Sequence, residues 1–162
     1  MYHLDHATQT QDRDRRFTLA ATLALIRTLT GVVAWTLDVC AEALSHVCPT
    51  YYSLERGEDG LAMPWSGHVW CNPPWSQLQR WTSKAWEEWE RGECDSITML
   101  IPVRTEQPFW QQLVEPYRDL ADGPLQVHFL PKRQEFGSPT DPEKKIKGSP
   151  PFICCVLHWS KK

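Results

Sequence analysis

The sequence predicts a single, small α/β domain, built on a mainly parallel β-sheet with helices on both faces. Short apolar segments alternate with amphipathic segments of about 10–15 residues, which is the pattern of βαβ units. The chain has 162 residues, enough for one domain with a sizeable core. Residues 1–16 are polar and charged and are expected to form a flexible N-terminal segment, so the predicted domain covers residues 17–162.

The first predicted elements are a helix and a buried strand. Apolar residues recur at three- and four-residue steps from Leu19 to Leu29, which is the spacing of an amphipathic helix, and Gly31 is a typical residue to end it. Residues 32–37 form a short apolar run with two valines at its start. We therefore expect a buried strand there, ending at Asp38.

The middle of the chain predicts two helices around a second strand. Residues 40–47 are expected to form a short helix, which closes before Pro49 because the residue before a proline leaves the helical region. The apolar run 68–71 is expected to be a strand. Ser76 is a suitable N-cap for a helix over 77–91, whose apolar residues follow one helical face.

The last third of the chain predicts three strands, one helix and a long loop. The apolar runs 97–101, 125–130 and 152–159 have the length and composition of strands. Residues 106–120 are expected to form a helix. The segment 137–151 is rich in Pro, Ser, Lys and Asp, and this composition is typical of a loop.

Composition and charge exclude several classes of protein. A net charge of -3 excludes a globally basic nucleic-acid-binding surface, so any phosphate contacts must come from local patches. The longest mainly apolar stretch, 19–39, is interrupted by Arg27 and Gly31 and predicts no membrane span, and the N-terminus has no signal-peptide pattern. We expect a cytoplasmic protein whose six cysteines are free thiols. Their spacing has no Cys-x2-Cys pair and predicts no metal site.

The strongest functional signal is the tetrapeptide Asn72-Pro73-Pro74-Trp75, directly after the predicted strand 68–71. One interpretation is structural, since two prolines make a stiff turn after a strand. The other is chemical. Ligands of α/β sheets bind at the carboxyl ends of the strands, and two successive prolines give a rigid backbone whose carbonyls are free to accept hydrogen bonds.

These residue types suit a planar amino group. If the Asn72 side-chain oxygen and the Pro73 carbonyl point to one place, they can accept both hydrogens of an NH2 group such as the exocyclic amine of adenine. Those bonds would draw a poorly nucleophilic nitrogen toward a tetrahedral, more reactive state. Trp75 would offer a stacking face to a base rotated out of its helix. We therefore interpret Asn72, Pro73, Pro74 and Trp75 as candidate catalytic residues.

Several segments around this motif carry a family resemblance. They are Trp35-Thr-Leu-Asp-Val-Cys-Ala41, Cys48-Pro-Thr-Tyr-Tyr52, Glu58-Asp-Gly-Leu-Ala-Met-Pro-Trp-Ser-Gly67, Val69-Trp-Cys-Asn-Pro-Pro-Trp-Ser76, Leu100-Ile-Pro-Val-Arg104 and Phe129-Leu-Pro-Lys-Arg-Gln-Glu-Phe136. In order and spacing they resemble the phage-type DNA N6-adenine methyltransferases, a Dam-like family that uses S-adenosylmethionine. The resemblance extends from Phe17 to about Trp159.

The resemblance implies a Rossmann-like class I methyltransferase fold with S-adenosylmethionine as the cofactor. In amino-methyltransferases of this fold, an acidic residue after the first strand lies near the methionine part of the cofactor, and Asp38 takes this role here. A second acidic residue, before the catalytic strand, lies near the cofactor's adenine, and Asp59 takes that role. The other implied cofactor contacts are Thr18, Cys40, Ala41, Gly60, Leu61 and Asn72. The glycine-rich loop that often follows the first strand is missing, and Trp75 stands where tyrosine is commoner.

The resemblance also implies double-stranded DNA as the partner, with no membrane and no obligate protein partner, in the cytoplasm of a bacterial host. Arg104, Lys132 and Arg133 follow predicted strand ends and are candidate substrate contacts through phosphate, together with Trp75 through the base. The lysines within 144–147 are interleaved with acidic residues and are interpreted as a solvated loop. Whether the protein is a monomer or a homodimer stays open.

Two other functions stay open as well. Asn-Pro-Pro-aromatic suits other planar amines, so the acceptor could be an RNA adenine, cytosine N4 or a protein glutamine. The missing glycines and the small size also suit a nucleic-acid-binding module with a decayed active site. The leading hypothesis is methyl transfer from S-adenosylmethionine to N6 of a flipped adenine in DNA.

Overall fold

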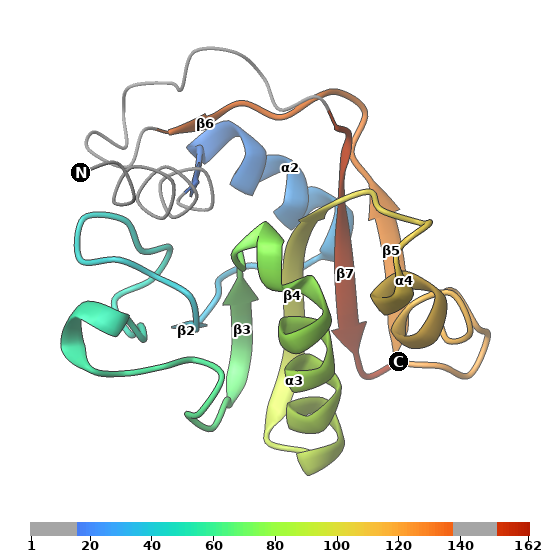
Figure 1. The fold of residues 1–162 in the computed structure, drawn as a ribbon, viewed down its shortest axis with the longest axis horizontal. Coiled ribbons are helices and arrows are strands. Elements are labelled where there is room, and N and C mark those ends of the chain that lie inside the picture. The colour runs from blue at the N-terminus through green and yellow to red at the C-terminus, as the bar shows by residue number, and fades with distance from the viewer. Residues whose placement is uncertain (1–15, 138–151) are drawn as a thin grey trace, which may run out of the picture.

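A five-stranded sheet forms the centre of the computed structural model, which describes residues 16–137 and 152–162 (Figure 1). In spatial order its strands are β2 Leu37–Asp38, β3 Gly67–Cys71, β4 Cys94–Pro102, β7 Cys154–Ser160 and β5 Leu125–Phe129. A second, two-stranded sheet pairs β1 Phe17–Thr18 with β6 Phe136–Gly137. Except for Arg16, the predicted flexible segment 1–16 lies outside the described residues, and so does the predicted loop from 138 onward.

The central sheet is mixed, so the expectation of a mainly parallel sheet was wrong. β2 and β4 both pair with β3 in parallel, whereas β7 pairs with β4 and with β5 in antiparallel fashion. Parallel neighbours need a crossover connection, usually a helix. Between β5 and β7 the described residues contain no helix, and β7 enters between β4 and β5 in the opposite direction. An apolar run in the sequence does not encode strand direction.

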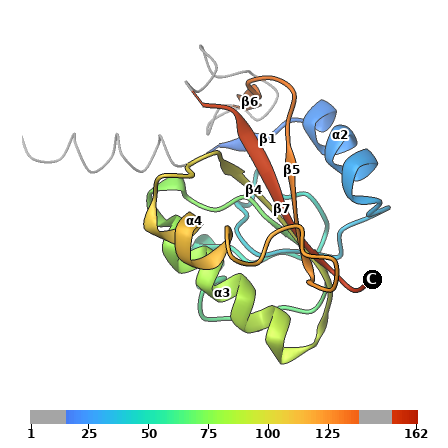
Figure 2. The same cartoon turned by 90° about the vertical axis from the view of Figure 1, so that its right-hand side faces the viewer.

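Helices cover both faces of the sheet, as expected (Figure 2). Helix α2 Ala20–Thr30 lies on one face, and α3 Leu78–Arg91 and α4 Pro108–Leu113 lie on the other. Because alternate strand residues point to opposite faces, the sheet divides the interior into two apolar cores. The core beneath α3 and α4 includes Val69, Ile97, Met99, Leu157 and Trp159. The core beneath α2 includes Ile26, Trp70, Leu100 and Val156.

The segment after α2 differs most from the prediction. Gly31 does end the helix, with a φ of 75° and its N–H donating to the Arg27 carbonyl. The predicted strand 32–37 is a strand only at its end, because residues 32–36 are irregular and Val33 is 90% exposed. The predicted helix over 40–47 was wrong, since this segment is a loop.

The later elements follow the prediction with shifted ends. Helix α3 begins one residue after the predicted start, and Ser76 is not its N-cap because it lies inside the 3-10 turn η2 Trp75–Gln77. The predicted helix 106–120 is shortened to α4, and Pro116 cannot supply the N–H that a longer helix needs. The strands predicted at 68–71, 97–101, 125–130 and 152–159 are confirmed as β3, β4, β5 and β7. Another short 3-10 turn, η1, spans Leu54–Arg56.

The helices in the described part of the chain are too short or too polar to span a bilayer. All six cysteines are free thiols, as predicted.

A row of polar side chains crosses three neighbouring strands of the sheet. His68 Nδ1 lies 2.9 Å from Ser96 Oγ, and Thr98 Oγ1 lies 3.2 Å from His158 Nδ1. His158 is only 3% exposed. Its burial, together with the neighbouring imidazoles of His128 and His68, lowers the pKa of His158 to about 4.

We expect His158→Asn to make the fold less sensitive to acid. As pH falls from about 6.5 toward about 4, the unfolded state takes up a proton on His158 that the folded state does not, so the free energy of unfolding decreases. The largest loss from this one residue is about 3 kcal/mol. Urea denaturation of both proteins between about pH 7 and about pH 4.5 measures the difference. Parallel stability curves for wild type and variant would contradict the prediction.

Candidate active site

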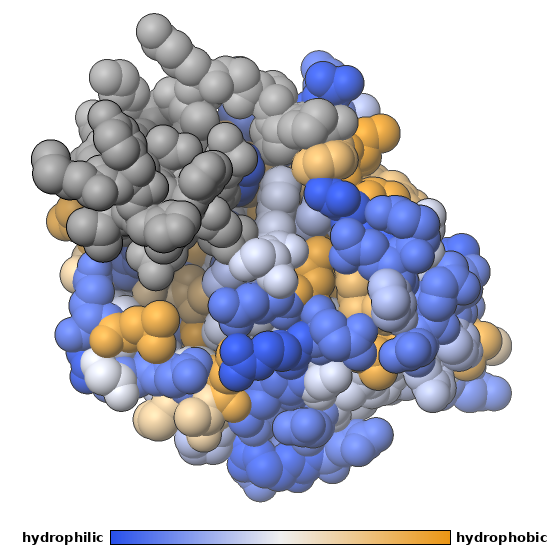
Figure 3. Space-filling model, in the orientation of Figure 1, coloured by the Kyte–Doolittle hydropathy of each residue, from blue (hydrophilic) through white to orange (hydrophobic). Residues whose placement is uncertain are grey.

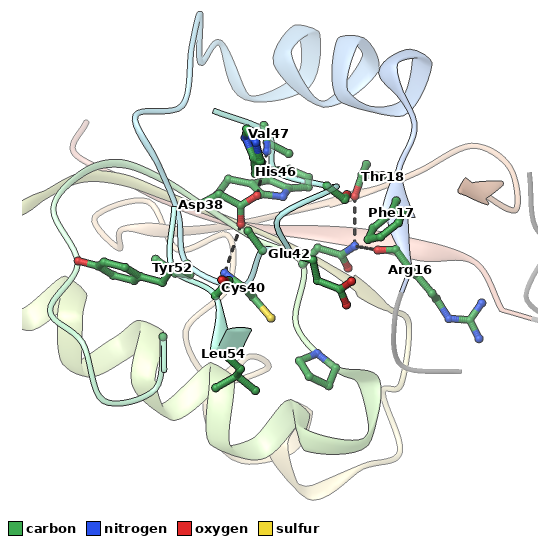
Figure 4. A pocket seen from close by; sticks show the side chains of 18 of the residues that line it. Arg16, Phe17, Thr18, Asp38, Cys40, Glu42, His46, Val47, Tyr52 and Leu54 are labelled. Carbon is green, nitrogen blue, oxygen red and sulfur yellow. Dashed lines mark hydrogen bonds between the residues drawn. The ribbon is translucent and has the colours of Figure 1, made fainter. Parts of the chain in front are cut away.

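A cavity of about 1110 Å³ opens at the carboxyl ends of β2 and β3 (Figure 4). It is bordered by the loop after β2, by the Asn-Pro-Pro-Trp turn after β3 and by the segment that contains β1. It brings together every residue for which the sequence implies a cofactor contact, and also one of the motif prolines. These residues are Thr18, Asp38, Cys40, Ala41, Asp59, Gly60, Leu61, Asn72 and Pro74.

The Asn72 amide is held by the segment before α2. Its Nδ2 donates to the Arg16 carbonyl at 2.7 Å and to Thr18 Oγ1 at 3.2 Å (Figure 4). Because a carbonyl can only accept, the first of these bonds assigns Nδ2 to this side and places Oδ1 on the other. Within residues 16–137 and 152–162, no donor is bonded to Oδ1.

The two motif prolines differ in what their carbonyls contact. Pro73 is buried, and Pro74 is half-buried at the cavity wall. The Pro74 carbonyl accepts the Gln77 N–H at 3.0 Å and so begins the turn into α3. Of the two carbonyls, that of Pro73 is therefore the one that the described residues leave without a donor.

Asp38 organises the loop after β2. Its carboxylate is 3% exposed, with Oδ1 accepting from the Cys40 N–H at 3.2 Å and Oδ2 from the Val47 N–H at 3.0 Å. The second bond is incompatible with a helix over residues 40–47, because in a helix the Val47 N–H would donate to the Ala43 carbonyl. Burial raises the pKa of Asp38 to about 6, although the two N–H donors and His46 oppose the rise. A positive charge in the cavity would favour the ionised carboxylate.

The turn before β3 packs directly against the end of β2. Asp59 Oδ1 accepts from the Leu61 N–H at 2.9 Å, and the Gly60 carbonyl accepts from Trp65 Nε1 at 2.8 Å. A Cβ atom at Gly60 would lie 1.9 Å from the Val39 carbonyl oxygen. Only glycine therefore permits this close approach of the two backbones.

One side of the cavity is acidic and has unsatisfied polar atoms. Five carboxylate residues line it: Asp38, Glu42, Glu55, Glu58 and Asp59. Ser53 Oγ and Glu58 Oε2 are buried there and have no hydrogen-bond partner in the described part of the chain. Buried polar atoms are normally satisfied, so at these two atoms the described part of the chain leaves hydrogen-bonding capacity unused. Sequence reasoning missed both residues, although Glu58 directly precedes the predicted Asp59.

Trp75 lies beside the cavity rather than on its wall. Its ring packs edge to face against Phe136, with 5.6 Å between the ring centroids. The Arg16 guanidinium lies over the Trp75 ring, 4.5 Å from its centroid. The guanidinium thus covers a face of the indole that the sequence assigns to a stacked base.

The residues predicted to contact phosphate do not line the cavity. They are Arg104, Lys132 and Arg133. Arg104 lies 3.8 Å from the ring centroid of Phe152, near the start of β7, and the other two are exposed after β5. Two arginines that the sequence analysis did not single out, Arg16 and Arg80, do line it. A signal was available for Arg80, because it follows the Asn-Pro-Pro-Trp motif within the first turn of α3.

The cavity also has an apolar rim. Leu44 and Leu54 line it and are 72% and 77% exposed. Figure 3 shows apolar side chains on the surface of the segment between β2 and β3. Exposed leucines at a cavity mouth suit the flat apolar face of a ligand such as a nucleobase.

A buried ionic network joins α3 to the segment before β3. Glu88, which is 5% exposed, accepts from the Trp65 N–H at 2.9 Å and from Arg91 Nε at 2.8 Å, and it pairs with Lys84. Burial alone would raise the pKa of Glu88, but the hydrogen bonds from Lys84, Trp65 and Arg91 outweigh it and lower that pKa. The network therefore holds the turn that contains Asp59 against the core.

An α/β sheet with an acidic cavity at its strand ends, next to an Asn-Pro-Pro-Trp turn whose Asn72 Oδ1 has no donor among the described residues, fits the methyltransferase class. Within that class, the chain belongs to the DNA N-6-adenine-methyltransferase (Dam) family, whose model matches residues 5–125. The Dam-like resemblance of the sequence is thereby confirmed. Methyltransferases of this kind generally use S-adenosylmethionine.

Other comparisons are less informative. No curated protein matches the chain significantly. Among solved structures, a putative RNA methyltransferase from Pyrococcus horikoshii is similar, with a TM-score of 0.48 and 13% sequence identity over 88% of this chain and 82% of that chain.

Proposed function

We propose that the protein transfers a methyl group from S-adenosylmethionine to N6 of an adenine that is rotated out of double-stranded DNA. The observation that carries this proposal is the Asn72 amide, whose Oδ1 borders the cavity without a donor while Nδ2 is held by two acceptors. The carbonyl of Pro73, the next residue in the chain, also lacks a donor within the described residues. Membership of the Dam family supports adenine N6 as the acceptor.

The residues around the cavity fit S-adenosylmethionine. Its sulfonium and amino groups are positive, and the acidic side of the cavity would stabilise positive charge. The two rim leucines, Leu44 and Leu54, suit a flat ring. When bound, the cofactor would supply an electrophilic methyl group. We assign its contacts to Asp38, Cys40, Ala41, Asp59, Gly60 and Leu61.

The turn after β3 would receive the acceptor amine. Asn72 Oδ1 and the Pro73 carbonyl would each accept one hydrogen of the adenine NH2 group, which localises the lone pair on nitrogen. For the base to stack on Trp75, the Arg16 guanidinium must leave the ring, and a DNA phosphate is a suitable partner for it. Arg80, Arg104, Lys132 and Arg133 are further proposed phosphate contacts.

The proposal is tested by offering labelled S-adenosylmethionine with one acceptor at a time. The acceptors are duplex DNA, RNA of the same sequence, duplex DNA without adenine, and a glutamine-containing peptide. We expect label only with the first, recovered as N6-methyladenine when the DNA is digested and its nucleosides are analysed by mass spectrometry. If label appears only in RNA, only in cytosine or only in the peptide, that group is the acceptor and the assignment to DNA adenine is wrong. Absence of label in every sample would overturn the methyltransferase assignment and favour a decayed site.

S-adenosylmethionine is expected to bind more weakly below the pKa of Asp38, which is about 6. A proton on the carboxyl removes the negative charge that favours the cationic ligand, so the dissociation constant should rise by up to about tenfold per pH unit below that value. Calorimetric titration across this range measures the change. S-adenosylhomocysteine, which has no charge on sulfur, is the matched ligand and should show a shallower dependence. Equal slopes for the two ligands would contradict this role of Asp38.

A further inference from the structure

The contact between Asn72 and the strand β1 joins residues far apart in sequence. Asn72 Nδ2 bonds to Thr18 Oγ1 and to the Arg16 carbonyl, across 54 and 56 positions (Figure 4). Neither bond is needed to form the Asn-Pro-Pro-Trp turn, because that turn is closed by its own backbone through Pro74 and Gln77. The two bonds therefore act on the side chain of Asn72 and not on its backbone.

These bonds determine which end of the amide faces the cavity. The oxygen and nitrogen of an asparagine side chain are almost identical in size, so packing alone does not distinguish the two orientations. With the amide reversed, Oδ1 would face the Arg16 carbonyl, which has no hydrogen to donate. The Arg16 carbonyl therefore fixes the orientation, and the Thr18 hydroxyl, as a second acceptor for Nδ2, holds the oriented amide in place.

Strand β1 is held firmly enough to position the Asn72 amide. It pairs with β6 in antiparallel register, Phe17 opposite Gly137 and Thr18 opposite Phe136. The side chains of Phe17 and Phe136 are 6% and 2% exposed. The segment that leads to β6 is itself tied to α2, because Thr22 Oγ1 donates to Gln134 Oε1 at 3.0 Å.

We propose that Thr18 is a positioning residue, whose hydroxyl holds in place the Asn72 amide that the Arg16 carbonyl orients, so that Oδ1 stays aligned with the acceptor amine. This inference rests on the proposed function, and it gives Thr18 a role different from the cofactor contact that the family resemblance implies. Valine has nearly the shape of threonine but cannot accept a hydrogen bond. Serine keeps the hydroxyl and loses only a methyl group. Comparing Thr18→Val with Thr18→Ser therefore separates the effect of the hydrogen bond to Asn72 from the effect of side-chain packing.

Steady-state kinetics and cofactor binding test the proposal together. We expect Thr18→Val to lower kcat for methylation by roughly 10–100-fold, because a reacting group that loses its alignment costs about this much. The dissociation constant for S-adenosylmethionine should stay within about twofold of wild type, and Thr18→Ser should recover most of the rate. Thr28→Val, an exposed threonine of α2, is the control. A cofactor affinity that falls in proportion to kcat, or a serine variant as slow as the valine variant, would overturn the proposal.

A second measurement does not depend on activity. The side-chain NH2 signals of Asn72 are assigned in a nitrogen–proton correlation spectrum by their loss in Asn72→Asp. In Thr18→Val one of the two protons should shift and exchange faster with water, and Thr18→Ser should restore it. Unchanged Asn72 signals in Thr18→Val would overturn the positioning role. If wild type transfers no methyl group while the spectra change as expected, the proposed function fails and the contact is still established.

Discussion

Replacing Asn72 by alanine is expected to lower the rate of N6-adenine methylation by roughly 10²–10³-fold, the cost of removing one preorganised polar group from a reacting centre. The substitution removes Oδ1, which no described residue uses, and leaves the rigid Pro73-Pro74 backbone in place. The rate of product formation at saturating DNA and cofactor is the measurement. The affinity for the cofactor should change much less, because the acidic side of the cavity is untouched.

Gln79→Ala is the matched control for this prediction. Gln79 also has an amide side chain, but it is exposed on α3 and does not line the cavity. The Gln79→Ala variant should methylate DNA at the wild-type rate. Thermal unfolding of both variants shows whether the lost contacts to Arg16 and Thr18 have weakened the fold. A folded Asn72→Ala protein with the wild-type rate would remove the basis of the proposed mechanism.

Replacing Glu88 by alanine is expected to destabilise the fold by about 3–5 kcal/mol, because it breaks a buried ion pair on one side only. Lys84, whose side chain is 12% exposed, would lose its partner, and the Trp65 N–H would lose its acceptor. In a domain of this size each kcal/mol lowers the midpoint of thermal unfolding by about 2–4 °C. We therefore expect a midpoint roughly 6–20 °C below that of wild type.

The neighbouring Glu87 provides the comparison. It lies on the same helix, is exposed and has no ion-pair partner in the described part of the chain. Glu87→Ala should change the free energy of unfolding by about 0.5 kcal/mol at most. If both alanine variants unfold at the same temperature, the Glu88 network contributes no more than a surface charge, and the support that it gives to the Asp59 turn is absent.

The position of the site could be predicted from the sequence because it depends on local signals. A short apolar strand, two prolines and an asparagine placed the turn at 72–75, and Asp38 was placed after a preceding strand. The turn follows β3 as predicted, whereas Asp38 is the last residue of the two-residue strand β2 and does not follow a longer strand. Asp38 and Asn72 both border the cavity. The helices α2 and α3 were also predictable, since apolar spacing and the glycines at 31 and 92 are properties of the helices themselves.

The remaining features depend on contacts between distant residues. The segment 40–47 has the composition of a helix, but the Asp38 carboxylate captures the N–H group of Val47, and no local pattern records that bond. The direction of β7 is likewise set by its neighbours. Ser53 and Glu58 are notable only because their buried oxygens have no hydrogen-bond partner among the described residues, which is a property of the folded chain.

The reversed strand β7 has a consequence for the order of events during synthesis. It lies between β4 and β5, so β5 has no strand partner in the central sheet until residues 154–160 are available. A chain still attached to the ribosome can complete the Asn-Pro-Pro-Trp turn and the parallel pairs of β2, β3 and β4, but not the sheet. We therefore expect nascent chains that stop before β7 to expose apolar β-strand edges and to be held by chaperones until β7 pairs with β4 and β5.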